Sequence, residues 1–329
     1  MIEEIKDSIS KDFNNLSFDL ENWNEVLKDS SDVSVFHLES SIEYYVAYYK
    51  GINISFLLYE NNTPLAVFPL FAYKDNNQWI MSTNGEGIIG PLFVQETPKK
   101  LRKRLEKQIV EILYIISNKL KIEKARFFEP NLILSSWYLL WLENNYKDFL
   151  KYQLAIDLRK SIEDIRLGFR KSYKPLVNKA LKEWEIEVCD KDNDKIFEEF
   201  RLLHLEAAGK ETRTRDSWDI QKEQIKNKEA FLVTVRDEGE LIGAGFFNYT
   251  KDMGMYSVAA YKRELFDRPI GHAVQMLAIE KLKELGCKTY YLGQKATSGI
   301  STDKEISISY FKEGFAGHIV AQPNLEVTI

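Results

Sequence analysis

One segment near the C-terminal end of the chain has residue types that suit a diphosphate ligand: Arg268-Pro269-Ile270-Gly271-His272-Ala273. Pro269 fits the first turn of a helix, because the N–H that proline lacks is one that a helix leaves unpaired. Gly271 lets a ligand approach the backbone. The free N–H groups of the first turn, the helix dipole and the charge of Arg268 all favour phosphate. We therefore expect a phosphate-binding turn made by Arg268, Ile270, Gly271, His272 and Ala273.

Hydrophobic spacing and turn residues predict the elements that position this segment. Residues 253–259 alternate as a strand before it, and a helix runs from it to about Gly286. A second strand at 289–293 and a short helix that ends at Phe315 follow. This order places the turn between a strand and a helix, where the helix N-terminus can face a ligand.

Two short motifs in this region resemble those of a known superfamily. The turn from Arg268 to Ala273 resembles the R/Q-x-x-G-x-G/A pyrophosphate loop of the GNAT acyltransferases, and Tyr310 to Phe315 resembles their closing Y-x-x-x-G-F. The motifs also come in the order that the superfamily has. Pro269 departs from the pattern, because it removes a backbone donor that a pyrophosphate loop could use.

A longer resemblance covers the end of the chain. Residues 272–293 (HAVQMLAIEKLKELGCKTYYLG) and 311–317 (FKEGFAG) are similar to the end of the Fem-type aminoacyltransferases that build peptidoglycan cross-bridges. Those proteins consist of two GNAT-like domains in tandem. The resemblance implies the same fold here, with acyl transfer as the activity.

The resemblance implies catalytic roles for two residues of the last helix. Tyr310 aligns with the tyrosine that protonates the leaving thiolate in GNAT enzymes, so we expect it to be the general acid. Lys312 stands where Fem-type enzymes keep a lysine near the acyl donor. As one of 17 tyrosines, Tyr310 could equally be a core residue. Lys312 could equally be a solvated surface lysine.

Several polar residues are candidates for the acceptor side. Arg170 and Lys174 lie in a segment, 169–180, that resembles the Fem-type connector, whose basic residues face the substrate cleft. Lys174 replaces the usual arginine and so loses the bidentate fork. The stretch 209–218 is too polar for a core and too rich in Arg and Trp for an ordinary linker, and such loops often contact ligands. The predicted substrate-binding residues are Arg170, Lys174, Arg213, Arg215, Trp218, Tyr256 and Gln294.

His204 is a candidate catalytic residue that could act as a base, on a helix expected from about 195 to 208, although the sequence does not identify the general base. Glu206 lies two residues further on and would point to a different side of that helix, so the two cannot face one cleft. Only four histidines occur, without HExxH spacing or clustered carboxylates, and we expect no metal ion. No activated nucleophile is visible, which favours direct transfer over a covalent intermediate.

Composition narrows the class of protein. With 329 residues, 44% hydrophobic and 29% charged, the chain suits a globular protein of two ordinary domains. A net charge of -5 gives no global basic field, so we expect no DNA partner. No secretory signal or apolar run of roughly 20 residues is visible, and two cysteines suit a reducing compartment. We expect a cytoplasmic protein without a membrane span, with room for peripheral contact with a membrane-borne substrate.

The pattern of elements predicts an α+β fold with two GNAT-like domains in tandem, each a mixed, mainly antiparallel sheet flanked by helices. Residues 1–150 would form a degenerate N-terminal copy, with a hairpin over 54–71 and an amphipathic helix over 98–120. The basic face of that helix is the best local candidate for a polyanion, although a solvated face is the favoured interpretation. Residues 151–329 would form the C-terminal domain that carries the donor loop.

The first hypothesis is an N-acyltransferase that moves an acyl group from acyl-CoA, with acetyl-CoA as the favoured donor, to an amine on a sugar or nucleotide-linked sugar of cell-envelope glycan synthesis. A rival keeps the fold and takes aminoacyl-tRNA as donor and a peptidoglycan precursor as acceptor. A second rival is a non-catalytic module that binds an anionic glycan precursor. Under the first hypothesis the partners are a small-molecule acyl donor and an amino-sugar acceptor, and tRNA enters only under the rival.

Overall fold

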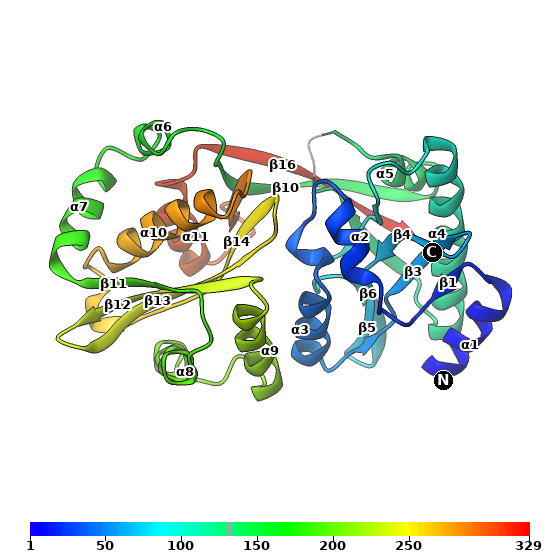
Figure 1. The fold of residues 1–329 in the computed structure, drawn as a ribbon, viewed down its shortest axis with the longest axis horizontal. Helices are drawn as coiled ribbons and strands as arrows, with labels where there is room; N and C mark the ends of the chain where they lie inside the picture. The colour runs from blue at the N-terminus through cyan, green and yellow to red at the C-terminus, as the bar shows by residue number, and fades with distance from the viewer. Residues whose placement is uncertain (131–132) are drawn as a thin grey trace. The chain divides into compact units, whose positions relative to one another are not determined.

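The computed structural model of the chain describes residues 1–130 and 133–329, which form helices and strands in an α+β arrangement (Figure 1). The chain divides into two compact units. Unit 1 comprises Met1–Lys151 and Ala321–Ile329, and unit 2 comprises Tyr152–Val320. The last residues of the chain therefore fall in unit 1, whereas the sequence analysis placed them with the C-terminal domain.

Unit 1 contains six helical segments and nine complete strands among the residues that the structure describes. The helices are α1 (Ile2–Asp12), α2 (Trp23–Asp29), the 3-10 helix η1 (Val35–His37), α3 (Glu39–Tyr49), α4 (Lys99–Leu120) and α5 (Ser136–Trp141). The strands are β1 (Leu16–Ser17), β2 (Ile52–Asn53), β3 (Phe56–Glu60), β4 (Thr63–Phe68), β5 (Phe71–Asp75), β6 (Gln78–Ser82), β7 (Ile88–Ile89), β8 (Leu92–Phe93) and β9 (Lys124–Phe128). One sheet has the order β1-β3-β4-β8 and another has the order β2-β5-β6.

Two hairpins of unit 1 are closed by asparagine pairs. Asn61 and Asn62 have φ angles of 50° and 62°, and Asn76 and Asn77 have 48° and 65°. Positive φ at both central residues is the type I′ turn that matches the twist of antiparallel strands. The predicted hairpin is confirmed, but its second strand ends at Phe68 because Pro69 has no N–H to continue the ladder.

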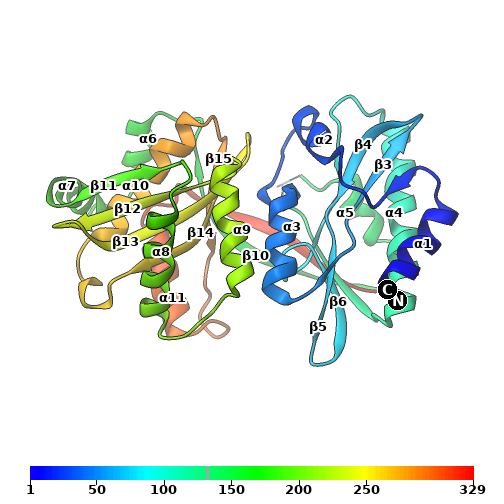
Figure 2. The ribbon, with the colours of Figure 1, turned by 60° about the horizontal axis from the view of Figure 1, so that its bottom comes forward.

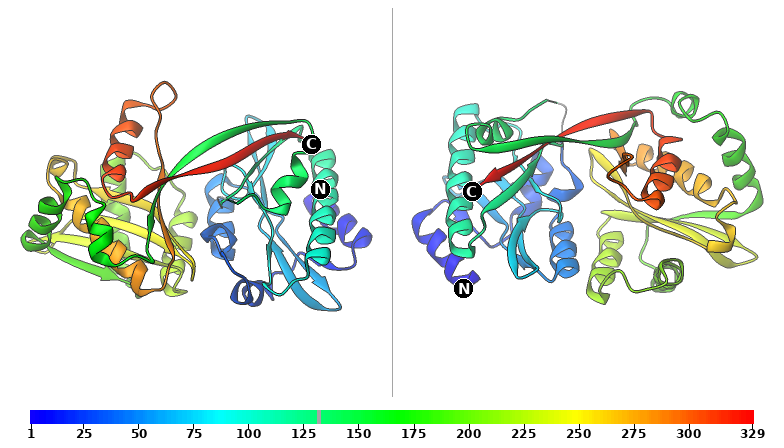
Figure 3. Two further views of the ribbon diagram at one scale, coloured as in Figure 1. Left: turned by 90° about the horizontal axis from the view of Figure 1, so that it is seen from above. Right: turned by 180° about the vertical axis from the view of Figure 1, so that it is seen from behind.

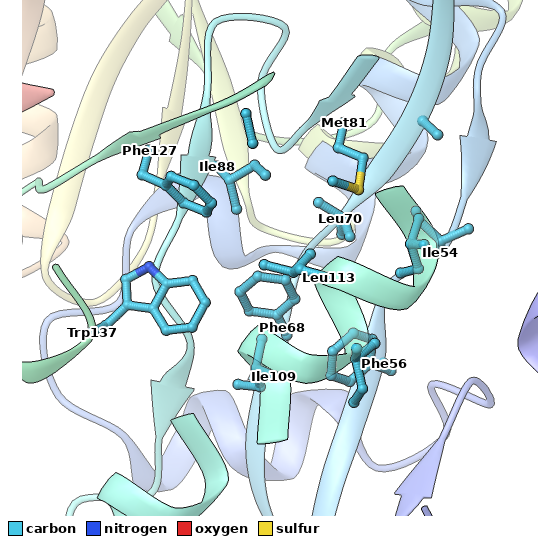
Figure 4. Packing of buried hydrophobic residues seen from close by; sticks show 14 of the residues in the cluster. Ile54, Phe56, Phe68, Leu70, Met81, Ile88, Ile109, Leu113, Phe127 and Trp137 are labelled. Atoms are coloured by element: carbon cyan, nitrogen blue, oxygen red, sulfur yellow. The ribbon is translucent and has the colours of Figure 1, made fainter. Parts of the chain in front are cut away.

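Helix α4 supplies the main apolar face of unit 1. Its buried apolar side chains recur at helical spacing, at Leu105, Ile109, Ile112, Leu113, Ile116 and Leu120. Figure 4 shows how side chains of the strands, among them Phe56 and Phe68, gather around Ile109 and Leu113. The predicted amphipathic helix is thus confirmed. On its basic face, Arg104 pairs with Glu60.

The end of the chain is tied to unit 1 by backbone pairing. Strand β16 (His318–Thr328) lies antiparallel to β9, from Asn324 opposite Phe128 to Thr328 opposite Lys124. The buried side chains of Leu325 and Val327 join the core of unit 1, and Figure 3 shows the C-terminus beside α4. This pairing explains why the last residues leave the second unit.

The main strands of unit 2 follow the order β11-β12-β13-β14-β15-β10 within a nine-stranded sheet. These strands are β10 (Tyr146–Asp157, which begins in unit 1), β11 (Glu185–Cys189), β12 (Ala230–Asp237), β13 (Glu240–Tyr249), β14 (Met253–Tyr261) and β15 (Thr289–Gln294). The helices of unit 2 are α6 (Ile162–Leu167), α7 (Tyr173–Glu183), α8 (Asp194–Ala208), α9 (Arg215–Lys226), the 3-10 helix η2 (Arg263–Leu265), α10 (Ile270–Glu284) and α11 (Asp303–Glu313). Neighbouring strands are antiparallel except β14 and β15, which are parallel.

Alternation along the central strands gives this sheet two apolar faces. On β12, Phe231 and Val233 join one core cluster, whereas Leu232 joins another. Helices α10 and α7 cover the first face, and α8 and α9 cover the second (Figure 2). Side chains from opposite faces are therefore separated by the sheet.

One predicted loop is partly helical. The stretch 209–218 was expected to be a ligand-contacting loop, but α9 begins at Arg215. The Thr214 hydroxyl caps it by accepting a hydrogen bond from the Ser217 N–H. Among the described residues, no helix combines the length and the apolar character needed to cross a bilayer.

A buried carboxyl in α4 gives a test of the unit 1 core. Glu106 is 2% exposed, its Oε1 accepts a hydrogen bond from Ser136, and burial raises its pKa. When the pKa of a carboxyl is higher in the folded than in the unfolded protein, the protonated carboxyl stabilises the fold. This contribution is full below the pKa of the unfolded state and is lost as pH rises through the pKa of the folded state. We expect Glu106→Gln to raise the free energy of unfolding at pH 7 by about 1 kcal/mol.

Urea unfolding at pH 7 and pH 4 checks this prediction. The gain should shrink at pH 4, where the native carboxyl is already protonated. Glu111→Gln, an exposed change on the same helix, is the control and should have little effect at either pH. A Glu106→Gln variant that is less stable than the native chain at pH 7 would contradict the assignment.

Candidate functional site

The parallel pair β14 and β15 holds together over a short stretch only. Met253, Gly254 and Met255 lie opposite Thr289, Tyr290 and Tyr291, and no further pairing of the two strands is present in the described residues. Beyond this stretch, β14 continues beside β13 and β15 continues beside β10.

An irregularity follows the pairing in each strand. The register of β14 against β13 shifts so that Phe246 faces Val258 while Phe247 faces Tyr256. The register of β15 against β10 shifts where Leu154 faces Gly293 and Ala155 faces Tyr291. Bulges bend strands and re-aim side chains. The two strands therefore part toward their carboxyl ends, which is where Tyr256 and Gly293 lie.

Lys312 of α11 enters this place. Its Nζ lies 5.2 Å from the centre of the Tyr256 ring, within reach of a cation–π interaction. Burial lowers the pKa of Lys312 to about 8, and within residues 1–130 and 133–329 no acidic group pairs with it. The solvated surface lysine considered in the sequence analysis does not describe this side chain.

Gly293 makes room for the amine. A Cβ at this position would lie 2.8 Å from Lys312 Nζ, closer than Cβ contacts occur in practice. Its φ of 115° is also a conformation that other residues rarely adopt. The sequence analysis noted Gly293 only as the end of a strand. Its signal was a glycine directly before the polar stretch that leads to α11.

Buried hydroxyl groups surround the base of the site. The Tyr256 and Tyr261 hydroxyls lie 3.0 Å apart, and the Tyr290 hydroxyl donates to Gln275 Oε1 at 2.6 Å. Burial raises the pKa of Tyr256 to about 12 and raises that of Tyr261 further. All three tyrosines are therefore neutral near pH 7 and act as hydrogen-bonding groups. Tyr261 and Gln275 were not predicted, because residues scattered over β14 and α10 share no motif.

The predicted phosphate turn leads into α10, and two of its side chains face the protein interior. Ile270 and Ala273 are buried in the core of unit 2. The missing side chain of Gly271 admits the ring of Phe311, which would lie 3.0 Å from a Cβ there, so this glycine allows two elements to pack. Figure 3 shows α10 and α11 on the same side of the sheet.

His272 packs among aromatic rings. Its ring centre lies 4.4 Å from that of Tyr173 and 5.2 Å from that of Phe311. Burial, with the charge of Arg170 as a smaller cause, lowers the pKa of His272 to about 4, so the ring is neutral at pH 7. Its buried Nε2 has no hydrogen-bond partner within the described chain.

Arg268 is already engaged. It forms an ion pair with Glu183 at the end of α7, and its guanidinium carbon lies 5.2 Å from the centre of the Trp184 ring. To contact a phosphate at the start of α10, Arg268 would have to leave Glu183. The proposed role of this turn in binding a diphosphate therefore stays a prediction, with a competing ion pair in place.

Tyr310 lies on the outside of α11, with 61% of the residue exposed. The Arg170 guanidinium stacks on its ring at 3.8 Å and donates to its carbonyl oxygen at 3.0 Å. Arg170 also donates to the Tyr173 hydroxyl at 3.1 Å. Residues two apart on a helix point to different sides, so the side chains of Tyr310 and Lys312 do not face one point. The interpretation of Tyr310 as a core residue does not fit its exposure.

The candidate base lies on the other face of the sheet. His204 Nε2 accepts a hydrogen bond from Arg213 at 3.0 Å, and the ring packs against Trp218 at 5.1 Å. Burial and, second, the charge of Arg213 lower the pKa of His204 to about 4. The lone pair that a base needs is thus taken by Arg213.

The remaining acceptor-side residues are dispersed. Trp218 is 4% exposed and belongs to the core between α8, α9 and the sheet. Arg215 is exposed and pairs with Glu198 and Asp219. Lys174 is half-buried on α7, and Gln294 is exposed at the end of β15. Of the predicted substrate-binding residues, Tyr256 is the one that contacts Lys312.

Replacing Gly293 tests the geometry around the amine. In Gly293→Ala the new Cβ would push Lys312 Nζ toward water, so the pKa of Lys312 should rise from about 8 toward the ordinary lysine value near 10.4. A titration of the lysine side-chain NMR signals would measure this change.

Gly239→Ala is the matched control. Gly239 also has a positive φ, 85°, but a Cβ there would meet nothing within 4 Å. Both variants should lose about 1 kcal/mol or more of stability from backbone strain. Only Gly293→Ala should move the Lys312 titration, and an unmoved titration would refute the contact.

Comparisons with known proteins place the fold. No protein-family model and no curated protein matches the chain. Among solved structures, FemX superposes with a TM-score of 0.71 at 12% identity, covering 95% of this chain and 96% of FemX. L-PGS from Bacillus licheniformis has a TM-score of 0.61 at 14% identity, covering 94% of this chain and 92% of L-PGS. A third structure is the C-terminal domain of a protein from Agrobacterium fabrum that is named as a lysylphosphatidylglycerol synthetase. It has a TM-score of 0.61 at 13% identity, covering 94% of this chain and 90% of that domain.

These similarities span nearly the whole of each chain, although the identities are low. They agree with the α+β class, with the mixed, mainly antiparallel sheets, and with the strand, helix, strand, helix order of unit 2. The chain therefore has the fold of FemX, which is of the α+β class that the order of its elements predicts.

Proposed function

We propose that the chain is an acyltransferase that moves an acyl or aminoacyl group from an activated donor to an amine of a cell-envelope glycan precursor. The observation that carries this proposal is Lys312, a partly buried cation without an anion, held where β14 and β15 part in a FemX-like fold. Perturbed titratable groups of this kind concentrate at functional sites.

Lys312 suits the central step of acyl transfer. Attack on an acyl carbonyl places negative charge on its oxygen, and a positioned cation in a water-poor site stabilises that charge. Because no carboxylate of the described residues pairs with Lys312, an oxyanion would not have to displace one. The ring of Tyr256 lies 5.2 Å from the amine, and its neutral hydroxyl hydrogen-bonds that of Tyr261.

Acyl-CoA is the first donor to consider. The turn at the start of α10 has the residue types of a pyrophosphate loop, and the first N–H groups of any helix lack intrahelical acceptors. Acetyl-CoA is the simplest member of this class. Its diphosphate would compete with Glu183 for Arg268.

Aminoacyl-tRNA is the alternative donor, and two observations favour it. Arg268 is held by Glu183, which weakens the case for a diphosphate at α10. One similar structure is named for the synthesis of lysylphosphatidylglycerol, an aminoacylated lipid. Under this alternative the acceptor is a peptidoglycan precursor, and a module that binds its ligand without turnover remains an outcome of the tests below.

We propose a catalytic role for Lys312 in preference to Tyr310 and His204. Tyr310 stays a prediction as general acid, and its exposed ring under Arg170 would reach a leaving group only from the outer side of α11. His204 lies across the sheet with its lone pair bound by Arg213, so we do not place it in the mechanism.

Calorimetric titration separates the donors. If acyl-CoA is the donor, acetyl-CoA should bind with micromolar affinity, and Arg268→Ala should weaken binding by about 1 to 3 kcal/mol, the usual worth of a charge-assisted contact. Lys182→Ala, an exposed lysine near the end of α7, is the charge control. Binding of charged tRNA that weakens with salt, without heat from any CoA ester, would favour the alternative.

Replacing Lys312 tests the catalytic assignment. Lys312→Gln should lower kcat by about 100- to 1000-fold, the typical cost of losing an oxyanion-stabilising donor, with little change in the affinity for the donor. Lys304→Gln, an exposed change on the same helix, should leave the rate unchanged. Binding of donor and acceptor without turnover in the native chain would instead support the non-catalytic module.

A further inference from the structure

Lys312 differs from several other lysines of unit 2. Lys295 pairs with Glu313, Lys262 pairs with Glu240, and Lys281 pairs with Asp190. The amine of Lys312 instead meets an aromatic ring on one side and a glycine on the other. An ammonium in such a place loses part of its hydration without gaining an anion.

The groups that face this amine leave it uncompensated. Strand β14 offers the ring of Tyr256, and β15 offers Gly293. On α10, His272 packs against Phe311 of α11 and is neutral at pH 7. On α11 itself, the carboxylate of Glu313 is taken by Lys295. Burial is accordingly the cause of the lowered pKa of Lys312, about 8.

We infer that Lys312 is a modification site, at which activated acyl groups such as acyl thioesters or acyl phosphates form an amide with its side-chain amine. The inference rests on the proposed function in one respect, because that function brings an acyl thioester to the site. It goes beyond that function, because the lysine becomes an acceptor in place of the substrate amine.

The step is an ordinary acyl substitution. The lone pair of the neutral amine attacks the acyl carbonyl carbon, a C–N bond forms and the C–S bond of the thioester breaks. The proton that leaves the nitrogen neutralises the departing thiolate, so the products are an N-ε-acyl-lysine and a free thiol. With an acyl phosphate the bond to the phosphate oxygen breaks instead, and phosphate leaves.

The modification would switch the site off. An amide nitrogen carries no positive charge, so an acylated Lys312 could no longer stabilise an oxyanion. An amide is also a far poorer acyl donor than a thioester, and the group would stay on the lysine. An acyl donor in excess over the acceptor amine would thereby inactivate the protein with time.

The rate advantage follows from the fraction of neutral amine. With a pKa of about 8, roughly a tenth of Lys312 is neutral at pH 7, against well under a thousandth for a lysine near 10.4. A less basic amine is also a weaker nucleophile, and partial burial slows access. We expect a net preference on the order of tenfold over an exposed lysine.

Competitive labelling of the full chain tests this inference. Trace acetic anhydride and, separately, acetyl phosphate and acetyl-CoA are added between pH 6 and 10, and acetylation is mapped by mass spectrometry with exposed Lys171 as the internal reference. Lys312 should label about ten times faster than Lys171 at pH 7, with an inflection near pH 8. Lys312→Arg should abolish this label.

The outcomes separate the inference from the proposed function. Acetic anhydride needs no donor site, so Lys312 labelling no faster than Lys171 with every reagent would overturn the inference while leaving the acyltransferase open. Fast labelling by the small reagents, with none by acetyl-CoA, would support the reactive lysine and count against acyl-CoA as donor. If Lys312→Arg is misfolded, Tyr256→Phe keeps the ring and should retain the preference for Lys312.

Discussion

The short pairing between β14 and β15 is the constraint on which the site depends. Three residue pairs fix the two strands side by side, and the irregularity that follows in each strand sends them apart. If the pairing continued, backbone groups would fill the place that Lys312 enters. Because it stops, Tyr256 from one strand and Gly293 from the other come to lie on two sides of one amine. The position of the lysine is thus a consequence of strand geometry and not of a local motif.

Packing against α10 shows how one set of residues can satisfy two requirements. The turn from Arg268 to Ala273 has the residue types of an anion site, yet the side chains of Ile270 and Ala273 pack in the core of unit 2. Gly271 admits the ring of Phe311, and His272 stacks on Tyr173. The His272 N–H donates to the Pro269 carbonyl oxygen at 3.0 Å, so the backbone N–H groups that this turn could offer to a ligand are those of Ile270 and Gly271. Donor binding at this turn therefore depends on main-chain geometry and on the competition for Arg268.

Much of the fold could be predicted from the sequence, because it rests on local signals. The apolar spacing of α4 and the order of elements in unit 2 come from periodicity and turn residues. The site was harder to predict. Tyr310 was found through the resemblance to the GNAT motif and Lys312 through the resemblance to Fem-type enzymes, but neither pattern shows that the two side chains point to different sides of α11. Tyr261 and Gln275 become neighbours only through tertiary packing.

The electrostatics of the two sheet faces differ in a way that decides between the candidate groups. On the α8 face, His204 is buried but gains a hydrogen bond from Arg213, which both satisfies it and removes its basicity. On the α10 face, Lys312 is partly buried beside the Tyr256 ring and pairs with no acidic group of the described residues, so its charge remains available to a ligand. Burial lowers the pKa of both residues, but of the two only Lys312 keeps a group that can act on a ligand. An unpaired, partly buried charge destabilises the folded protein. A reacting ligand that develops negative charge beside it stabilises that charge and is stabilised by it.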